Sequence, residues 1–449
     1  MNTGRIEAAL LKANDTADVG IGSGLLPSVD EMFERSFGGQ RAVVVADENT
    51  FGVAGDEVRR HLEAAGRPMV DPYIFRGRPT LHAEYAHIER LTQALHAHDA
   101  IPIAVGSGSL NDIVKRASYE ARRRFMSVAT AASMDGYTAF GAAITKDGYK
   151  HTMTCPAPRA ALADLDILRN APARMTSSGY ADLLGKVPAG ADWLVADALD
   201  VEKVNAPVWS LVQGPLREAI GSPAELHEGD EHALDSLIEG LIMSGLAMQA
   251  AESSRPASGA EHQFSHLWEM EGLGYNDEPP LSHGFKVGVG SIAIAALYER
   301  ILSRDLSNLD VQTLVSRWPS WEQVELAVKE AHKTPGLDTA AIVESRTKYI
   351  TGDELRQRLT RLAERWSGLH KRLQEQLMTA DRLRRMLHDA GCPTHPSDIG
   401  LHLEDLKATY YRAQMIRRRY TVLDLATEAG ILEQCVNELF APGGFWAPD

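Results

Sequence analysis

The stretch that decides the fold is Ala100-Ile-Pro-Ile-Ala-Val-Gly-Ser-Gly-Ser-Leu-Asn-Asp112. Its first part, Ala100 to Val105, is apolar and typical of a buried strand. The strand leads directly into a glycine-rich turn that begins at Gly106, and a helical pattern follows from Ile113 to Arg124. A strand, a polar turn and a helix in this order are the repeating unit of a parallel α/β sheet.

The same unit recurs on both sides of this stretch. Arg41–Asp47 is a second apolar run, stopped by polar residues and followed by a helical pattern over Val53–Ala65. A further helical pattern covers His82–His98, and the short run Phe125–Ala129 ends in the polar turn Thr130–Gly136. The alternation predicts a doubly wound, Rossmann-like α/β domain, whose ligands bind at the carboxyl ends of the strands.

The character of the chain changes after about residue 172. Apolar residues then recur at helical spacing, as in Leu234, Leu237, Ile238, Leu241 and Ile242. The segments 321–331, 353–390 and 404–440 are also predicted to be helical. We therefore expect the class α/β plus all-α, with an α/β domain over residues 1–172 and an all-helical domain over 173–449.

The charge balance argues against a nucleic-acid partner. The 449 residues include 46 Lys and Arg against 61 Asp and Glu, a net charge of −15, whereas phosphate-backbone affinity needs excess positive charge. The basic runs Arg122–Arg124 and Arg417–Arg419 are interpreted as solvated helix faces, with anion or partner contacts as the alternative.

Cysteine use and hydropathy indicate the compartment. Cys155, Cys392 and Cys435 are scattered and form no CxxC pair. The polar N-terminus has no apolar signal core, and no stretch approaches the roughly 18 apolar residues of a membrane span. We expect a cytoplasmic protein without a membrane span.

Two turns carry chemistry suited to a nucleotide. Gly106, Ser107, Gly108 and Ser109 sit where backbone N–H groups and the helix dipole attract phosphate, although a plain tight turn is the alternative. The motif is neither GxGxxG nor a Walker A loop. Thr130–Ser133 adds hydroxyl groups at the end of the next strand and favours the nucleotide interpretation.

Asp47 closes the first strand and could accept hydrogen bonds from an adenosine ribose. The alternative is a helix cap for Asn49 and Thr50, and the local sequence leaves both open.

A cluster of histidines suggests a metal. His262 and His266 are four residues apart on one helix face, and His283 follows, but Gln263 excludes the HExxH motif. With Asp182 as a carboxylate, the set would suit zinc, iron or nickel. Alternatively, Asp182 pairs with Lys186 within its helix and the histidines only pack.

Six segments in order resemble the sn-glycerol-1-phosphate dehydrogenase family, and more closely its bacterial branch. They are GSGSLNDIVK, TAASMDG, PAPRAALADLDIL, MTSSGYADLLGK, SRPASGAEHQFSHLWEM and LSHGFKVGVG. The family belongs to the superfamily of iron-dependent alcohol dehydrogenases and dehydroquinate synthases. The likeness covers roughly residues 40 to 300, and it implies a dinucleotide-binding α/β domain followed by a helical metal- and substrate-binding domain.

The resemblance implies roles for individual residues. The dinucleotide pyrophosphate would lie on Gly106, Ser107, Gly108, Ser109 and Leu110, with Thr130 and Ser133 near the nicotinamide and Asp47 near the adenosine. The metal ligands would be Asp182, His262 and His283, for zinc or nickel, with iron also compatible. The residues that match substrate-binding positions are Asp135, Asp182 and His266, of which His266 and Asp135 are the candidate catalytic residues for proton relay.

The implied reaction is reduction of dihydroxyacetone phosphate to sn-glycerol 1-phosphate by NADH or NADPH, with the metal polarising the carbonyl. Asp47 would repel a ribose 2′-phosphate and so favours NADH. Lys186 and Lys286, and less directly Arg255, are candidates for binding the substrate phosphate. The resemblance further implies a homo-oligomer, a dimer or larger.

Three departures from the family concern the nicotinamide pocket and its surroundings. Ala139 stands where a serine is common, Met134 replaces a histidine, and Phe285 stands where many superfamily members have glutamate. None of them is a proposed metal ligand.

Other functions fit the same scaffold. One is a glycerol or polyol dehydrogenase, and another is a cyclase or lyase of the dehydroquinate synthase type. A catalytically silent binding protein is a third, but it would be expected to have lost the metal ligands.

Overall fold

A six-stranded parallel sheet forms the centre of the first part of the chain. The computed structural model describes residues 3–447, and the strands lie in the order β1-β8-β5-β4-β2-β3. All neighbouring strands pair in parallel. The strands are β1 (Asp18–Gly22), β2 (Ala42–Asp47), β3 (Tyr73–Phe75), β4 (Ile101–Gly106), β5 (Met126–Ala129) and β8 (Ala160–Asp164). The prediction of a parallel α/β sheet is confirmed.

Helices cover both faces of this sheet. Val44 faces the helices α2 (Val29–Phe37) and α4 (Asp56–Ala64), whereas its neighbours Val43 and Val45 face α5 (Tyr85–His96) and α6 (Gly108–Glu120). Every residue of β4 is buried. This two-sided burial explains why the central strands are continuous apolar runs rather than alternating ones.

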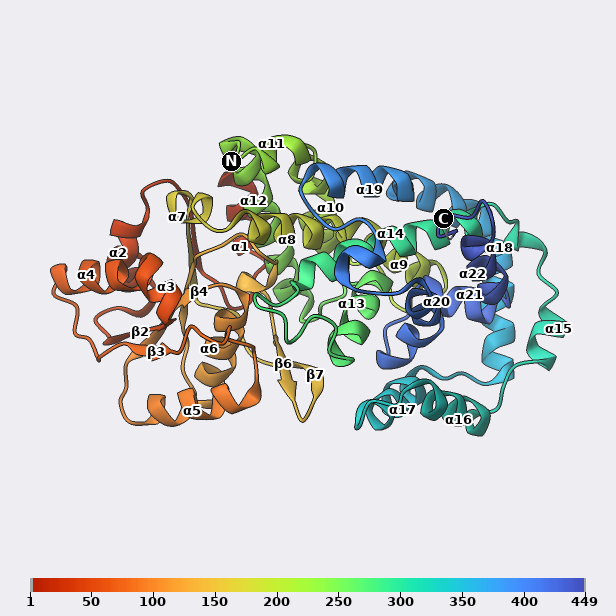
Figure 1. Ribbon diagram of the computed structural model, residues 1–449, viewed down its shortest axis with the longest axis horizontal. Coiled ribbons are helices and arrows are strands. Elements are labelled where there is room, and N and C mark those ends of the chain that lie inside the picture. Colours follow the sequence, from red (N-terminus) through yellow and green to blue (C-terminus); the bar gives the residue numbers. More distant parts are fainter. Residues whose placement is uncertain (1–2, 448–449) are drawn as a thin grey trace.

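The rest of the described chain is helical apart from short turns and loops. The helices are α8 (Ala173–Leu184), α9 (Lys186–Ala198), α10 (Ala206–Ala219), α11 (Pro223–His227), α12 (Glu231–Ala251), α13 (Ala260–Met270), α14 (His283–Leu302), α15 (Val311–Ser316), α16 (Trp321–Ala331), α17 (Leu337–Lys348), α18 (Gly352–Gln376), α19 (Ala380–Asp389), α20 (Leu403–Arg412), α21 (Val422–Glu428) and α22 (Leu432–Phe440). Figure 1 shows the sheet at one end of the molecule and these helices at the other. The buried helix α14 packs against α8, α13, α19 and α22.

Two elements near the junction have no counterpart in the sequence prediction. The helix α1 (Thr3–Leu10) packs on α12, and its Arg5 pairs with Glu239 of α12 and with Glu218 of the neighbouring α10. The antiparallel hairpin of β6 (Ala142–Lys146) and β7 (Tyr149–Met153) reaches α13. The domain boundary near Pro172 stays a prediction. Between residues 3 and 447, no helix is long and apolar enough to cross a membrane.

The interpretation of the two basic runs as solvated helix faces is wrong. Helix α6 ends at Glu120, and Arg122 has a positive φ of 57°, so Arg122–Arg124 form the turn that enters β5. Arg417–Arg419 lie in a non-helical segment between α20 and α21. The side chain of Arg419 points into the protein and donates a hydrogen bond to the Ser258 carbonyl oxygen. The predicted helix 404–440 is interrupted by this segment, and the predicted helix 353–390 is interrupted separately between Gln376 and Ala380.

Two glycines allow the segments around the domain junction to approach one another. A Cβ on Gly179 of α8 would lie 2.0 Å from the Ala132 carbonyl oxygen in the turn after β5. A Cβ on Gly284 of α14 would lie 1.9 Å from the Ser178 carbonyl oxygen of α8. Because both neighbours are backbone, neither position has room for a side chain.

We expect Gly179→Ala and Gly284→Ala each to lower the free energy of unfolding by roughly 2–3 kcal/mol, since backbone must move to admit the methyl group. Urea unfolding followed by circular dichroism measures this. Gly368→Ala in α18 is the control, because no atom lies within 4 Å of its Cβ. It should stabilise the helix by about 0.5–1 kcal/mol. Equal stabilities of Gly284→Ala and Gly368→Ala would contradict this account.

Candidate active site

A cleft of about 1230 Å³ lies where the carboxyl ends of the strands meet the helical part. Twelve residues named from the sequence as candidate site residues line it. They are Asp47, Ser107, Gly108, Ser109, Leu110, Ser133, Asp135, Asp182, His262, His266, His283 and Lys286. Residues up to 239 positions apart in the sequence therefore share one cavity (286 minus 47).

Four other candidates do not line the cleft. Gly106 and Thr130 lie just behind it, where the Thr130 N–H donates to the Gly106 carbonyl oxygen at 3.2 Å. Arg255 is buried and donates to the carbonyl oxygens of Tyr420 and Asp192. Lys186 has no exposed side-chain surface. The expectation that Lys186 or Arg255 binds the substrate phosphate therefore finds no support in the structure.

The glycine-rich turn leaves the amino terminus of α6 open toward the cleft. Ser107 is the N-cap residue, but its side chain makes no capping hydrogen bond. The first N–H groups of a helix have no partner within the helix and carry positive dipole charge. A Cβ on Gly108 would lie 2.9 Å from the Met134 side chain, so glycine is what allows Met134 to pack against this turn. The arrangement suits a phosphate group.

Asp47 makes a helix cap at the edge of the same cleft. Its Oδ1 accepts hydrogen bonds from the N–H groups of Asn49 and Thr50, at 2.8 and 2.9 Å. The helix cap, one of the two roles that the sequence allows for Asp47, is thus present. It also holds the carboxyl group in a fixed direction among the residues that line the cleft.

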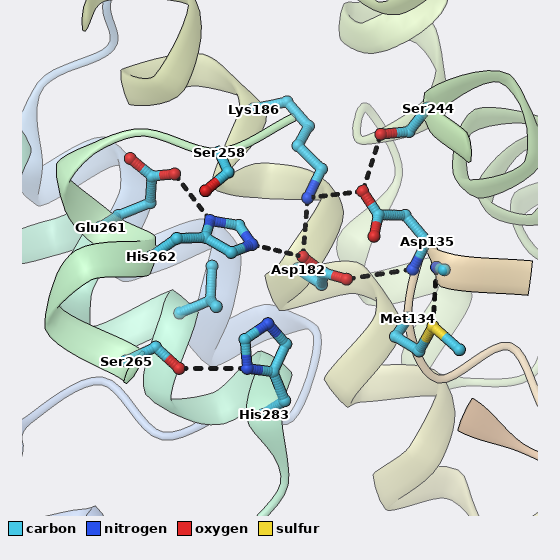
Figure 2. Close-up of polar contacts among 12 residues, drawn as sticks. Met134, Asp135, Asp182, Lys186, Ser244, Ser258, Glu261, His262, Ser265 and His283 are labelled. Atoms are coloured by element: carbon cyan, nitrogen blue, oxygen red, sulfur yellow. Dashed lines mark hydrogen bonds and ion pairs between the residues drawn. The ribbon is translucent and has the colours of Figure 1, made fainter. Parts of the chain in front are cut away.

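Asp182 from α8, His262 from α13 and His283 from the start of α14 come together across three helices. One ligand atom from each lies within 4.8 Å of the others, and His262 Nε2 is 3.4 Å from Asp182 Oδ1. Their ring and carboxyl groups converge in Figure 2. One carboxylate and two imidazoles are a donor set that zinc, nickel and iron accept, with coordination positions left for substrate.

Each of the two histidines is oriented by a carboxylate. His262 Nδ1 lies 2.7 Å from Glu261 Oε1, and His283 Nδ1 lies 2.8 Å from Glu269 Oε1. A carboxylate at Nδ1 fixes the tautomer in which Nδ1 carries the proton. The lone pair of Nε2 is then free for a metal, which is the usual arrangement behind metal-binding histidines.

Lys186 is enclosed between two carboxylates (Figure 2). Its Nζ lies 2.7 Å from Asp182 Oδ1 and 3.0 Å from Asp135 Oδ2, and Ser244 also donates to Asp135 Oδ2 at 2.7 Å. Burial acts to raise the pKa of Asp182, but Lys186 and the nearby histidines hold that pKa well below its usual value. Asp182 is therefore a carboxylate at neutral pH, as a metal ligand must be.

His266 lines the cleft beside the other two histidines. Its ring centroid is 5.6 Å from that of His283, and it makes no hydrogen bond with any residue in the range 3–447. Burial, and next the charge of Arg417, lower the pKa of His266 well below its usual value. A neutral imidazole with unused hydrogen-bonding atoms is thus available to a ligand.

The sequence reasoning missed four residues of this site. Glu269 follows His266 by three positions on the same helix, so helical spacing could have found it. Glu261 adjoins His262, and residues one apart do not share a helix face, so helical spacing does not mark it. Ser244 contacts Asp135 from α12, and Lys150 of the hairpin contacts Glu269 at 2.7 Å. These two are remote in sequence from their partners, and no local signal marks them.

Comparisons with known proteins show which family the chain is similar to. A family model described as iron-containing alcohol dehydrogenase matches residues 20–172. A protein from Halalkalibacterium halodurans named glycerol-1-phosphate dehydrogenase, NAD(P)+, is 38% identical over 257 residues, which are 57% of this chain and 64% of that protein. The chain thus spans slightly less than two thirds of that relative's length. A protein of the same name from Geobacillus thermodenitrificans is 30% identical over 397 residues, 88% of each chain.

The chain belongs to the glycerol-1-phosphate dehydrogenase family. This confirms the family resemblance, and the name of these relatives is that of an NAD(P)-dependent oxidoreductase. Membership implies NAD(P) and a divalent metal, without identifying the metal.

Solved structures show the same fold at low sequence identity. A probable glycerol dehydrogenase from Sinorhizobium meliloti is 15% identical, with a TM-score of 0.59 over 94% of this chain and 98% of that one. An iron-containing alcohol dehydrogenase from Corynebacterium glutamicum is 14% identical, with a TM-score of 0.56 over 94% of both chains. At these identities the likeness concerns the fold alone, and it confirms the predicted fold class.

We predict that Glu269→Gln weakens binding of Zn²⁺ or Ni²⁺ by about 10–100-fold, because His283 loses its charged hydrogen-bond partner. Competition against a chromogenic chelator measures the affinity without using catalysis. Glu271→Gln is the matched control, since Glu271 pairs with Arg412 and contacts none of the histidines. An affinity unchanged in Glu269→Gln would show that the carboxylate does not act on the metal site.

Proposed function

We propose that this glycerol-1-phosphate dehydrogenase family member reduces dihydroxyacetone phosphate to sn-glycerol 1-phosphate with NADH. The observation that carries the proposal is the shared cleft. It joins the open amino terminus of α6 to the cluster of Asp182, His262 and His283. A phosphate-binding helix start and a metal-type donor set in one cavity are what a metal-dependent NAD(P)H reductase requires.

Two bound groups would supply the chemistry that the chain lacks. Asp182, His262 and His283 would hold the divalent metal, zinc or nickel with iron also compatible, and the turn from Ser107 to Leu110 would hold the cofactor. When bound, the metal is a Lewis acid toward a substrate carbonyl and NADH is the hydride donor.

The side chains around these groups would position the substrate and its proton. His266 is neutral and has unused hydrogen-bonding atoms, so it can exchange a proton or a hydrogen bond with a substrate hydroxyl group. Asp135 lines the same cleft, and its Oδ2 is bound by Lys186 and Ser244. We assign His266 and Asp135 to proton relay and substrate contact.

The substrate phosphate requires positive charge within an acidic protein. Lys286 lines the cleft and lies 4.0 Å from Glu269 Oε1, and the same carboxylate group binds Lys150 of the hairpin. The Lys and Arg residues on the cleft wall are Lys146, Lys150, Arg174 and Lys286. We propose Lys286 as the main phosphate ligand, because Lys150 is already held at 2.7 Å by Glu269.

Further parts of the proposal concern the state of the protein. Cys155, Cys392 and Cys435 are buried and unpaired, which fits a reducing cytoplasm. A homo-oligomer and a domain boundary near Pro172 rest on the family resemblance and on the change to helices. Light scattering of the purified protein tests the first.

We predict that the metal-loaded protein oxidises NADH steadily with dihydroxyacetone phosphate and at least tenfold less efficiently with dihydroxyacetone. Lys286→Gln should raise KM for the phosphorylated substrate about tenfold, because one charged hydrogen bond to the phosphate is lost. KM for dihydroxyacetone should stay unchanged. Arg60→Gln, a similar loss of charge at an exposed site on α4, is the control. Absorbance at the NADH band gives both rates.

Other outcomes would identify the competing functions. A preference for unphosphorylated glycerol or dihydroxyacetone would make the protein a glycerol or polyol dehydrogenase. A reaction that returns NAD without net consumption of NADH would indicate a cyclase or lyase of the dehydroquinate synthase type. Full activity after complete removal of metal would exclude the role given to Asp182, His262 and His283.

We predict that Asp47→Asn narrows the preference for NADH over NADPH by about tenfold, because a ribose 2′-phosphate no longer meets a negative charge. Asparagine keeps an oxygen acceptor for Asn49 and Thr50, so the helix cap is retained. The ratio of kcat/KM for the two cofactors is the measurement. An unchanged ratio would place Asp47 away from the ribose, as a cap only.

A further inference from the structure

A second, smaller hollow lies at the opposite ends of the strands from the cleft. Its volume is about 350 Å³. Its wall includes Ile101 at the start of β4 and the turn Arg122–Arg124, which leads directly into β5. The hollow therefore lies at the amino ends of these strands. Four arginines line it: Arg122, Arg123, Arg124 and Arg159.

The four guanidinium groups have few counter-charges. Arg124 is paired with Asp15 at 2.8 Å, whereas Arg122 makes no side-chain hydrogen bond or ion pair with any residue in the range 3–447. Arg123 donates to the carbonyl oxygens of His98 and Ala100 and contacts no carboxylate.

The remaining polar groups of the wall do not neutralise the excess of positive charge. Arg159 is half-buried, and among the described residues its side chain makes one hydrogen bond, to the Asp15 carbonyl oxygen at 3.4 Å. Asp99 is the acidic side chain on the wall, and it is already paired with Arg41 at 3.3 Å. The Ser36 hydroxyl group also lines the hollow and has no hydrogen-bond partner among the described residues.

Half-buried guanidinium groups whose partners are neutral carbonyl oxygens are costly, because these oxygens replace only part of the water that burial removes and supply no counter-charge. Burial lowers the pKa of Arg123 from its usual value, which is a sign of this cost. An anion in the hollow would remove it by giving the guanidinium groups charged acceptors, and guanidinium groups bind phosphate oxygens with matched geometry.

We propose that this hollow is a binding site for a small multivalent oxyanion, an inorganic phosphate or pyrophosphate or the phosphate group of a small metabolite. The site is separate from the cleft and goes beyond the proposed reaction. Arg123 and Arg159 lie partly buried on a concave wall, so a small ligand that enters can reach them. A flat anionic surface would meet only the exposed Arg122 and Arg124, which favours a small ligand over a membrane.

Isothermal titration of the full chain with inorganic pyrophosphate tests the site. The titration is done at constant ionic strength in the Lys286→Gln background with saturating NADH, so that neither proposed phosphate position of the cleft competes for pyrophosphate. We expect one saturable site whose dissociation constant rises at least tenfold in Arg122→Gly and in Arg159→Gln. Glycine tolerates the positive φ at position 122, so the first variant removes the charge without straining the turn.

Arg60→Gln, which removes one exposed arginine of the same part of the chain, should bind pyrophosphate as tightly as the unmodified protein. Three results would overturn the proposal. They are no saturable binding at matched ionic strength, equal dissociation constants in all variants, and binding to phosphatidylserine vesicles in place of pyrophosphate. None of these readouts depends on catalysis, so the reductase proposal can fail or succeed separately.

Discussion

The buried ammonium group of Lys186 is the interaction on which the arrangement of the site depends. It lies between Asp182 of α8 and Asp135 of the turn after β5, which belong to different parts of the molecule. Two buried carboxylates this close would repel each other, and removing one member of such a group commonly costs about 3–5 kcal/mol. The Asp135 N–H also donates to Asp182 Oδ2 at 3.1 Å. A single lysine therefore joins the sheet to the helices at the point where substrate would bind.

The elements with strong local signals were predictable from the sequence. The central strands are buried on both faces, so β2, β4 and β5 are continuous apolar runs, and the polar turns mark their carboxyl ends. Helix α16 agrees with its predicted bounds. Helical spacing correctly placed His262 and His266 on one helix, and the family motifs named Asp182 and His283 as their partners. These residues meet in the structure because each motif lies at a helix that packs at the junction.

The rest depends on contacts between distant segments. Nothing in the run Arg122–Arg124 signals that α6 ends at Glu120 and that Arg122 has a positive φ, so the sequence pattern favours a helix face. Lys186 was a candidate phosphate ligand because its position next to a metal-site motif does not reveal burial between two carboxylates. Lys150 reaches Glu269 only through the β6–β7 hairpin, 119 residues away. The net charge of −15 likewise does not show where positively charged side chains cluster, because the cleft and the hollow lined by four arginines are local features.

The central claim is that Asp182, His262 and His283 hold a divalent metal beside the cofactor. Anomalous diffraction from crystals of the metal-loaded protein, collected at the zinc and nickel absorption edges, tests it most directly. The account predicts one peak at about 2.0–2.2 Å from a carboxylate oxygen of Asp182 and from a ring nitrogen of each histidine. A peak instead among His266, Glu269 and His283, which form the second possible donor group in the described chain, would contradict it. So would a fully active protein with no peak near Asp182.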